Sequence, residues 1–442
     1  MKKRLVCILF SLVFFAGCLT PLVGLAVTGG AKAGANEVLA VRPSLKNRDG
    51  TLNGDYLSGL ADYVNDRFYL RQECVTAWAR LNAALLRTSV TEDVLLGGDG
   101  WLYYAPTLDD YTGAAPMTDR ELWCAARTLF LLQEAVERRD GRFLFTVAPN
   151  KNSLYDDAMP AYPRASSPTN AESLAALLAD MGVNYVNLFE AFRTQPETLY
   201  FPTDSHWNGK GAALAADSLL AALGRDGAFF AGPFAAGEHR GDLYEMLCPA
   251  GLDLDADQVY APGFGFTADT ANANSITIRT QGGGEGALLM YRDSFGRNLY
   301  PFMAQAFSEA VFSRKTDFDP SPMADGGVMI VELVERNLRY LNTYPPTLPA
   351  AERDAALIEG AVPAGRIQAE RRAAADGSVS LRGTFTDVLP DDDSPVWILA
   401  DGAVYEAVPL PDGFSVTMPE GFSTLSAVFF SGGSLVMLDC IM

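Results

Sequence analysis

The chain has 442 residues, 49% of them apolar, which is enough for a large core and one smaller domain. Its formal net charge is −20, from 54 acidic and 34 basic residues, so no basic excess favours nucleic-acid binding. The composition fits a soluble, secreted or surface protein that handles neutral or weakly charged ligands.

The amino terminus predicts a membrane segment. Lys2, Lys3 and Arg4 precede residues 5–27, which carry no charge and are long enough to span a bilayer. The basic flank predicts that the short end stays inside and the bulk of the chain lies outside. We favour the interpretation that residues 1–28 are an uncleaved signal anchor. A signal peptide cleaved to release a secreted protein and a lipoprotein modified at Cys18 are the alternatives.

Residues 29–52 are predicted to be a spacer, and residues 53–345 one α/β domain. Helical spacing of apolar residues marks 54–87, and a capping box at Thr118 opens a helix that continues to about residue 139. Strand and helix patterns then alternate, which predicts a mostly parallel sheet covered by crossover helices. The predicted strands are 143–148, 185–188, 287–291, 310–313 and 328–333, and the predicted helices are 171–181, 211–223 and 299–307.

The carboxyl-terminal part has a different pattern. Residues 346–365 are proline-rich and are predicted to be a linker, and residues 366–442 show short strands between turns. A small antiparallel β domain is therefore expected. Its aromatic residues, such as Trp397, Tyr405 and Phe414, either form its core or present a stacking surface for sugars.

Four cysteines lie beyond the apolar segment, at positions 74, 124, 248 and 440. They could form two disulfides, but buried free thiols are the preferred interpretation. No cysteine or histidine spacing typical of a zinc site occurs, so no metal is predicted.

Two short motifs carry the chemistry. Asp204 and His206 stand two residues apart, and His206 is one of only two histidines in the chain. Ser294 follows a predicted strand and precedes a predicted helix, a placement that exposes its hydroxyl. A carboxylate, an imidazole and an exposed serine are the parts of a nucleophilic triad. Trp207 lines the cleft or fills the core, and Asn208 is expected to cap the next helix.

Several motifs together resemble the DHHW / AlgJ–AlgX-like branch of the SGNH hydrolase superfamily, which is associated with O-acetylation of extracellular polysaccharides. The name-giving motif has histidine where this chain has Ser205, and the usual glycine before Asp293 is Arg292. The matching segments lie at residues 65–68, 98–103, 148–151, 203–207, 241–243, 292–295 and 335–337.

The resemblance implies a flavodoxin-like SGNH fold and a triad of Ser294 as nucleophile, His206 as base and Asp204 as its orienting acid. Tyr300 resembles an aromatic residue of related sites, and Asn150 or Lys151 is a candidate for contact with an oxyanion or substrate. The resemblance implies a polysaccharide substrate, no cofactor, and a membrane-bound O-acyltransferase as acetyl donor. We expect an extracytoplasmic acetyltransferase or acetylesterase; the alternative is a non-catalytic glycan-binding or assembly protein.

Overall fold

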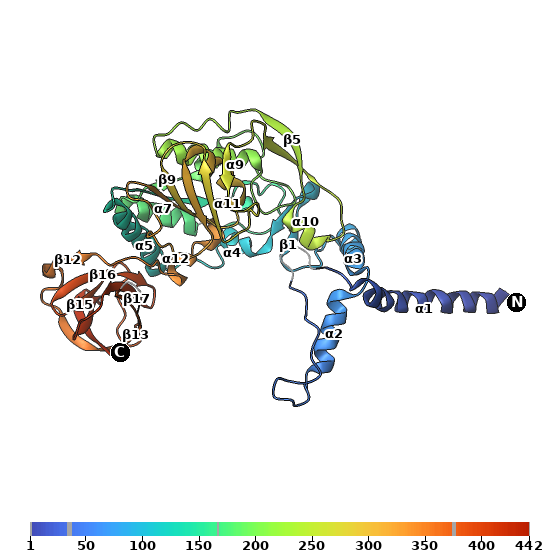
Figure 1. Ribbon diagram of the computed structural model, residues 1–442, viewed down its shortest axis with the longest axis horizontal. Coiled ribbons are helices and arrows are strands. Elements are labelled where there is room, and N and C mark those ends of the chain that lie inside the picture. The colour runs from blue at the N-terminus through green and yellow to red at the C-terminus, as the bar shows by residue number, and fades with distance from the viewer. Residues whose placement is uncertain (1, 33–37, 166–167, 374–376, 442) are drawn as a thin grey trace.

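A computed structural model of the chain describes residues 2–32, 38–165, 168–373 and 377–441. Figure 1 shows a long amino-terminal helix that leaves the folded body, a central α/β domain, and a β domain at the opposite end.

The amino-terminal part consists of three helices. Helix α1 (Lys2–Thr28) contains one segment, Arg4–Thr28, that is apolar and long enough to cross a membrane, a property that signal sequences share. The helical stretch predicted over 54–87 is two helices, α2 (Tyr56–Arg67) and α3 (Arg71–Leu86). The interruption lies at Leu70, whose φ of 65° is left-handed and therefore incompatible with a continuous right-handed helix.

Among the described residues, the α/β domain is built on a seven-stranded sheet of order β4-β3-β11-β9-β10-β8-β7. The pairs from β4 to β10 are parallel, and β8 and β7 extend the sheet with antiparallel pairs. The predicted mostly parallel sheet is confirmed. Its strands are β3 (Arg142–Ala148), β4 (Tyr185–Val186), β7 (Phe266–Ala268), β8 (Thr277–Gly282), β9 (Ala287–Tyr291), β10 (Glu309–Ser313) and β11 (Val328–Val334).

Helices cover both faces of this sheet because its central strands are apolar on both sides. In β3, Phe143, Phe145 and Val147 pack on α5 (Asp119–Glu137) and α7 (Asn170–Met181). Leu144 and Ala148 belong to the opposite core. That second core is formed with α8 (Leu188–Arg193), α9 (Gly209–Ala222) and α11 (Gly296–Ala306). The predicted caps form: Thr118 closes a capping box, and Asn208 accepts the Gly211 N–H at 2.9 Å.

Two hairpins and a short helix that the sequence pattern did not indicate surround the carboxyl edge of the sheet. Strands β1 (Val94–Leu96) and β2 (Leu102–Tyr104) form one hairpin. Strands β5 (Phe234–His239) and β6 (Asp255–Tyr260) form the other, with α10 (Asp242–Leu247) between them. Figure 1 shows β5 and α10 on the side of the domain that meets α3. The remaining short helices are η1 (Gly98–Gly100), η2 (Ala105–Thr107), α4 (Leu108–Thr112), α6 (Lys151–Leu154), η3 (Glu335–Asn337), α12 (Tyr340–Thr343) and η4 (Ala355–Ile358).

The carboxyl-terminal domain is β, as predicted, but it is a closed barrel and contains a parallel pair, β13 with β19. Two long strands produce the closure. The first part of β16 pairs with β15 and its end with β17, while β13 pairs first with β19 and then with β14. The strands are β12 (Glu352–Arg353), β13 (Val362–Ala373), β14 (Ser378–Thr384), β15 (Val396–Ala400), β16 (Ala403–Leu410), β17 (Gly413–Pro419), β18 (Leu425–Ser431) and β19 (Ser434–Ile441).

The aromatic residues of the barrel are structural. Phe414 is fully buried, Trp397 is 6% exposed, and Tyr405 packs against the barrel core. Trp397 and Phe414 are therefore too buried to stack on a sugar, which favours the core alternative, and Tyr405 is partly buried against that core. The predicted linker, residues 346–365, already contains β12, η4 and the start of β13.

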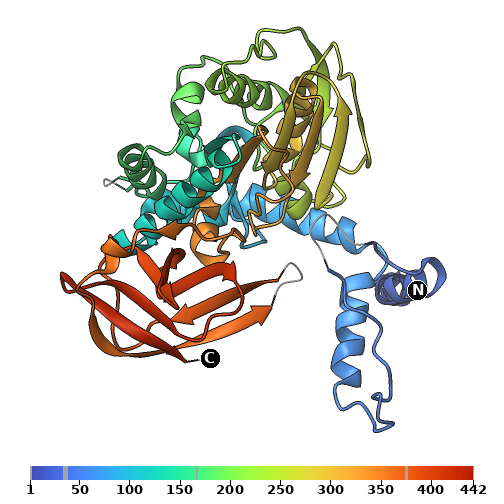
Figure 2. The same ribbon diagram turned by 60° about the vertical axis from the view of Figure 1, so that its left-hand side comes forward.

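Charged pairs join the barrel to α5. Glu406 is 2% exposed at its side chain and accepts Arg127 on one carboxylate oxygen and Arg353 on the other. Arg353 in turn binds both oxygens of Glu134. Figure 2 shows the barrel lying against the helices of the α/β domain. The cysteines are free thiols, as preferred over disulfides, but of the four beyond the apolar segment only Cys124 and Cys248 are buried, while Cys74 is exposed and Cys440 is half-buried.

Candidate active site

The loop from Tyr200 to Asn208 presents the Asp204–His206 motif at the carboxyl edge of the sheet. A buried lysine holds this loop: Lys151 Nζ donates to the carbonyl oxygens of Phe201 at 3.2 Å, Pro202 at 3.0 Å and Asp204 at 2.6 Å. Burial lowers the pKa of Lys151 to about 7. An ammonium group has three donors, so these three carbonyls satisfy it fully.

Asp204 and His206 form the predicted carboxylate–imidazole pair. His206 Nδ1 lies 2.6 Å from Asp204 Oδ1, and the same oxygen accepts the His206 backbone N–H at 2.9 Å. A proton on Nδ1 shared with Asp204 leaves Nε2 as the basic nitrogen. His206 Nε2 is buried and has no hydrogen-bond partner among the described residues.

The second histidine of the chain binds the other oxygen of the same carboxylate. His239 Nε2 lies 2.6 Å from Asp204 Oδ2, and the His239 ring stacks on Phe201 with centroids 4.1 Å apart. Asp204 Oδ2 also accepts the backbone N–H of Asp242 at 3.0 Å. Sequence reasoning missed His239 because its partner lies on another loop, far from it in the chain.

Ser205 and Asp242 add a second polar contact to His206. Ser205 Oγ donates to Asp242 Oδ2 at 2.7 Å and lies 3.1 Å from His206 Nδ1. Asp242 Oδ2 is itself 3.4 Å from that nitrogen. Ser205, which stands where the name-giving motif has histidine, therefore links His206 to a second carboxylate.

This cluster shifts the pKa values of its members in opposite directions. Burial opposes charge on both, but the attraction between Asp204 and His206 outweighs it. The pKa of His206 is raised by the charge and hydrogen bond of Asp204, with a further contribution from Asp242. The pKa of Asp204 is held well below its ordinary range by His206 and His239. The pair therefore favours a carboxylate beside an imidazole that accepts protons readily.

Asp204, His206 and Asp242 also have the composition of a cation site, with ligand atoms within 4.8 Å of one another. Each of these ligand atoms already has a hydrogen-bond partner inside the cluster. The geometry therefore indicates that the two carboxylates orient the imidazole of His206.

Ser294 lies in the turn between β9 and α11, as predicted. The preceding residue, Asp293, fixes the turn: its carboxylate accepts the backbone N–H groups of Phe295 at 2.9 Å and Val334 at 2.7 Å. Trp207 Nε1 donates to the Phe295 carbonyl at 3.1 Å, and the ring of His206 lies 4.7 Å from that of Phe295. The two predicted motifs therefore pack directly against each other.

Ser294, His206 and Ser205 line one cavity of about 680 Å³. No hydrogen bond joins Ser294 Oγ to His206 among the described residues, although looser geometry is common in enzymes without bound substrate. The other lining residues are Asp93, Tyr104, Asp242, Leu243, Met246, Arg292, Asp293, Arg314, Lys315, Thr316, Phe318, Leu333, Arg336, Asn337 and Tyr340.

The four remaining candidates, Asn150, Lys151, Trp207 and Tyr300, are not among the described residues that line this cavity. Asn150 accepts Arg336 Nη1 at 3.3 Å, and Lys151 holds the Asp204 loop. Trp207 is fully buried, and the Tyr300 ring lies 5.4 Å from that of Phe312. These side chains lie outside the lining of this cavity, and their contact with substrate stays a prediction.

Arg336 and Asn337 are two lining residues that sequence reasoning named only as part of a motif. The Arg336 guanidinium lies 5.2 Å from the Tyr104 ring and 5.5 Å from the Phe295 ring. Asn337 Nδ2 donates to Asp293 Oδ2 at 3.0 Å. Nearby Glu335 accepts the Asn150 backbone N–H, and its burial raises its pKa to about 7. Only the position of the motif, directly after the buried run that forms β11, could have indicated these residues.

Arg292, which replaces the usual glycine, is buried with its backbone N–H bonded to the Ser313 carbonyl at 2.8 Å. Its side chain lies over Gly296, where an added Cβ would come within 2.5 Å of it. Burial, followed by the charge of Arg314, lowers the pKa of Arg292 to about 10. Gly296 thus makes room for the arginine.

In a comparison with known proteins, residues 94–271 match the model of a family described as the SGNH hydrolase-like domain of the acetyltransferase AlgX. The probable alginate O-acetylase AlgJ of Pseudomonas syringae pv. tomato is 25% identical over 209 residues, which are 44% of this chain and 51% of that protein. The match thus spans about half the length of this curated relative.

Two solved structures are similar to this chain at lower sequence identity. The O-acetyltransferase domain of Pseudomonas putida AlgJ is 17% identical, with a TM-score of 0.38, covering 56% of this chain and 92% of that chain. A DHHW family protein from Eubacterium siraeum is 17% identical, with a TM-score of 0.43, covering 58% of this chain and 97% of that chain. The family match and the AlgJ relative together confirm the expected resemblance of this chain to the AlgJ/AlgX-like branch of the SGNH hydrolase superfamily.

Proposed function

We propose that this protein is an extracytoplasmic acetyltransferase or acetylesterase that acts on a cell-surface or exported polysaccharide. Its chemistry would be carried by Ser294, His206 and Asp204. The observation that supports this most is the Asp204–His206 pair: the 2.6 Å contact at Nδ1 leaves Nε2 unpartnered, and His206 lines the same cavity as Ser294.

In the first half-reaction, Ser294 Oγ attacks the carbonyl carbon of an acetyl ester while its proton passes to His206 Nε2. The tetrahedral intermediate then expels the donor's oxygen, which takes the proton from His206. Asp204 stays ionised and stabilises the imidazolium. The product of this step is acetyl-Ser294.

In the second half-reaction, a sugar hydroxyl or water attacks the acetyl carbonyl and gives its proton to His206. Collapse of the intermediate returns that proton to Ser294 Oγ. A sugar acceptor gives transfer and water gives hydrolysis, and both use the same three residues.

The cavity lining suits a carbohydrate acceptor. Tyr104 and Tyr340 supply aromatic rings, and Arg336 and Asn337 supply hydrogen-bond donors beside Ser294. Aromatic faces with a few polar donors are a common way to bind a sugar ring.

The donor is proposed to be a membrane-bound O-acyltransferase, since acetyl-CoA is cytoplasmic. The exposed apolar helix α1 supports a location at the membrane, as an anchor or, if cleaved, as a signal sequence. The basic residues before it favour an external catalytic domain.

A sulfonyl fluoride probe tests the proposal. We expect the probe to modify Ser294 and to abolish turnover of 4-nitrophenyl acetate, and Ser294→Ala to lose both labelling and turnover. Ser205→Ala is the matched control, because Ser205 lines the same cavity but contacts the Nδ1 side of His206. This control should still be labelled at Ser294.

Unchanged ester turnover in Ser294→Ala would contradict the proposal. It would favour the alternative, a non-catalytic glycan-binding or assembly protein that keeps the fold.

A further inference from the structure

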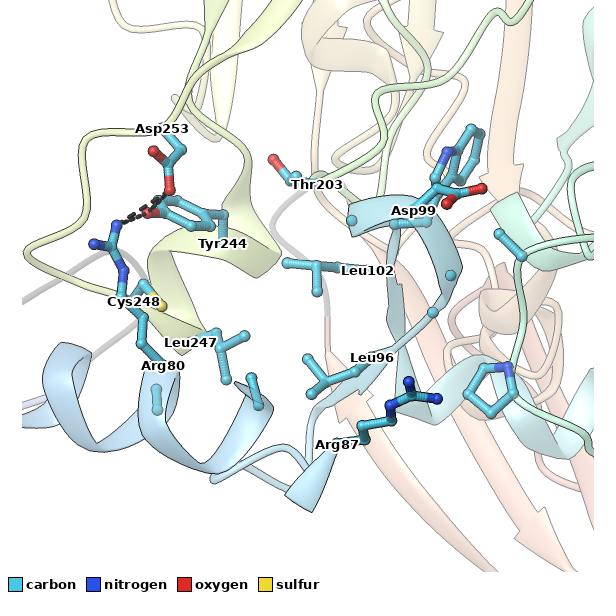
Figure 3. Close-up of a pocket in the computed structure, with 18 of the residues that line it drawn as sticks. Arg80, Arg87, Leu96, Asp99, Leu102, Thr203, Tyr244, Leu247, Cys248 and Asp253 are labelled. Atoms are coloured by element: carbon cyan, nitrogen blue, oxygen red, sulfur yellow. Dashed lines mark hydrogen bonds and ion pairs between the residues drawn. The ribbon is translucent and has the colours of Figure 1, made fainter. Parts of the chain in front are cut away.

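Helix α3 has two different faces. Thr76 and Ala79 are buried toward α10, and Arg80 on that side donates to Tyr244 Oη at 2.9 Å and Asp253 at 3.1 Å. Figure 3 shows this inner side, where Arg80 meets Tyr244 and Asp253 beside an open pocket of about 820 Å³. The inner face of α3 therefore belongs to the folded domain.

The outer face of α3 is apolar and exposed. Trp78 is 59% exposed, Leu81 49% and Leu85 71%. Their spacing of three and four residues puts them on one side of the helix, opposite Ala79 and Thr76. Three large apolar side chains in a row on an exposed helix face indicate a surface that meets an apolar partner.

The structure ties α3 to the end of the membrane segment. The Tyr69 N–H donates to the Pro21 carbonyl inside α1 at 3.1 Å, and the Ala31 N–H donates to Arg67 at 3.0 Å. An added Cβ on Gly24 would come within 2.3 Å of the Tyr69 side chain, so the two surfaces are in close contact. Helix α3 begins two residues after Tyr69.

The length of α1 determines how deep in the membrane the contact between Pro21 and Tyr69 would lie. From Arg4 to Pro21 the helix rises by about 26 Å at ~1.5 Å per residue. A hydrocarbon core is ~30 Å thick, so a spanning α1 would bring Pro21 and Tyr69 near its outer boundary. In Figure 1, α3 starts at this end of α1 and runs across its direction. Tyrosine and tryptophan are enriched at this boundary.

The charge of the segment fits a membrane surface as well. From Arg67 to Arg87 the sequence has four arginines and one glutamate, in a chain whose net charge is −20. Arg80 is paired with Asp253, but Arg87 is exposed at the end of the helix. An apolar stripe with tryptophan and flanking arginines is typical of helices that lie in the interface of anionic membranes.

We propose that the outer face of α3 lies on the anionic outer surface of the membrane beside α1 and is a second membrane contact of this protein. This proposal rests on α1 being retained as an anchor and is independent of the catalytic proposal. Because α10, which packs on α3, carries Asp242 into the cavity, this contact would also fix the cavity relative to the membrane.

Tryptophan fluorescence of the full-length protein in vesicles tests the proposal. Vesicles of phosphatidylglycerol with brominated acyl chains should quench the wild-type protein, and Trp78→Phe should remove most of that quenching. Trp123→Phe is the matched control, because Trp123 is half-buried on α5. It should leave the quenching unchanged, and phosphatidylcholine should give weaker quenching than phosphatidylglycerol.

A second variant keeps Trp78 and changes its neighbours. Leu81→Gln with Leu85→Gln should reduce the quenching of Trp78, while the circular dichroism spectrum and ester turnover in detergent stay as in the wild type. Equal quenching of the wild type and Trp78→Phe would overturn the proposal and favour a protein partner on this face. Equal quenching in both lipids would overturn its electrostatic part.

Discussion

The α/β domain and the carboxyl-terminal barrel bury different kinds of side chain. Around the cavity, Asp204, His206 and Lys151 are buried and bind one another or nearby backbone. Inside the barrel the buried cluster is apolar, and its buried carboxylate, Glu406, faces α5. Burying charge costs free energy unless partners are arranged in advance. The polar cluster is therefore where we propose the chemistry, whereas the apolar barrel core accounts for stability.

The largest expected effect is on turnover. His206→Ala and Asp204→Asn should each lower ester turnover, the former by roughly 10³-fold or more, because the nucleophile loses its base or the base its orientation. The double variant should lose little more than His206→Ala. Steady-state kinetics measure this, and losses that multiply would show that the two residues do not act as one unit.

Lys151→Met tests the α/β side of this comparison, because it removes a buried amino group that lies outside the cavity. Methionine fills similar space but removes the lysine donor from three carbonyl oxygens, of which, within the described part of the chain, only that of Pro202 keeps another donor, the Leu102 N–H. We therefore expect a loss of about 1–3 kcal/mol in stability. Displacement of the Asp204 loop should lower turnover roughly tenfold to a hundredfold. Lys210→Met, which breaks the ion pair between Lys210 on α9 and Glu197, is the control. Equal effects of the two variants would argue against a positioning role for Lys151.

In the barrel, by contrast, a substitution should lower stability without changing turnover. Glu406→Gln leaves Arg127 and Arg353 with a neutral partner at a buried joint, so unfolding free energy should fall by about 2–4 kcal/mol. No described residue of the barrel lines the cavity, so kcat on a small ester should not change below the unfolding transition. Thermal denaturation and kinetics on the same sample measure both quantities. A large loss of kcat with an unchanged melting temperature would break the comparison.

The smallest expected effect is a shift in pH dependence. Because the base acts in its neutral form, kcat/KM should rise with pH through the pKa of His206, which Asp204 and Asp242 raise. Asp242→Asn removes one negative charge, lowers that pKa and moves the acidic limb to lower pH. Asp253→Asn, an exposed carboxylate paired with Arg80, should leave the limb in place. A shift to higher pH in Asp242→Asn would contradict this electrostatic account.

The raised pKa of His206 also makes the stability of the protein depend on pH. A histidine whose pKa is raised on folding contributes stability that is fully present below its unfolded pKa of about 6.5. That contribution is lost as pH rises through the higher folded value. The wild type should therefore lose this part of its stability over a pH range that Asp242→Asn shifts downward.

Local patterns predicted the parallel sheet, the capped helices and the Asp204–His206 pair, because these depend on residues close in sequence. The β5–β6 pairing was not predicted because α10 interrupts the connection between the two strands, and the His239 contact was not predicted because its partner, Asp204, lies on a different loop. Barrel closure depends on β13, which pairs with β19 and then β14, and on β16, which pairs with β12 and β15 and at its end with β17; a period of two does not encode such switches. Lys151 was identified as special, but only its three carbonyl contacts show that it positions a loop.

Acetyl-enzyme mapping tests the central claim most directly. Tryptic cleavage after Arg292 and Arg297 releases residues 293–297, in which Ser294 is the only serine. After rapid acid quenching of the enzyme with 4-nitrophenyl acetate, mass spectrometry should find one acetyl group on this peptide in the wild type and in Ser205→Ala. It should find none in Ser294→Ala. Acetylation of Ser205 instead, or ester turnover without any acetylated serine, would contradict the account.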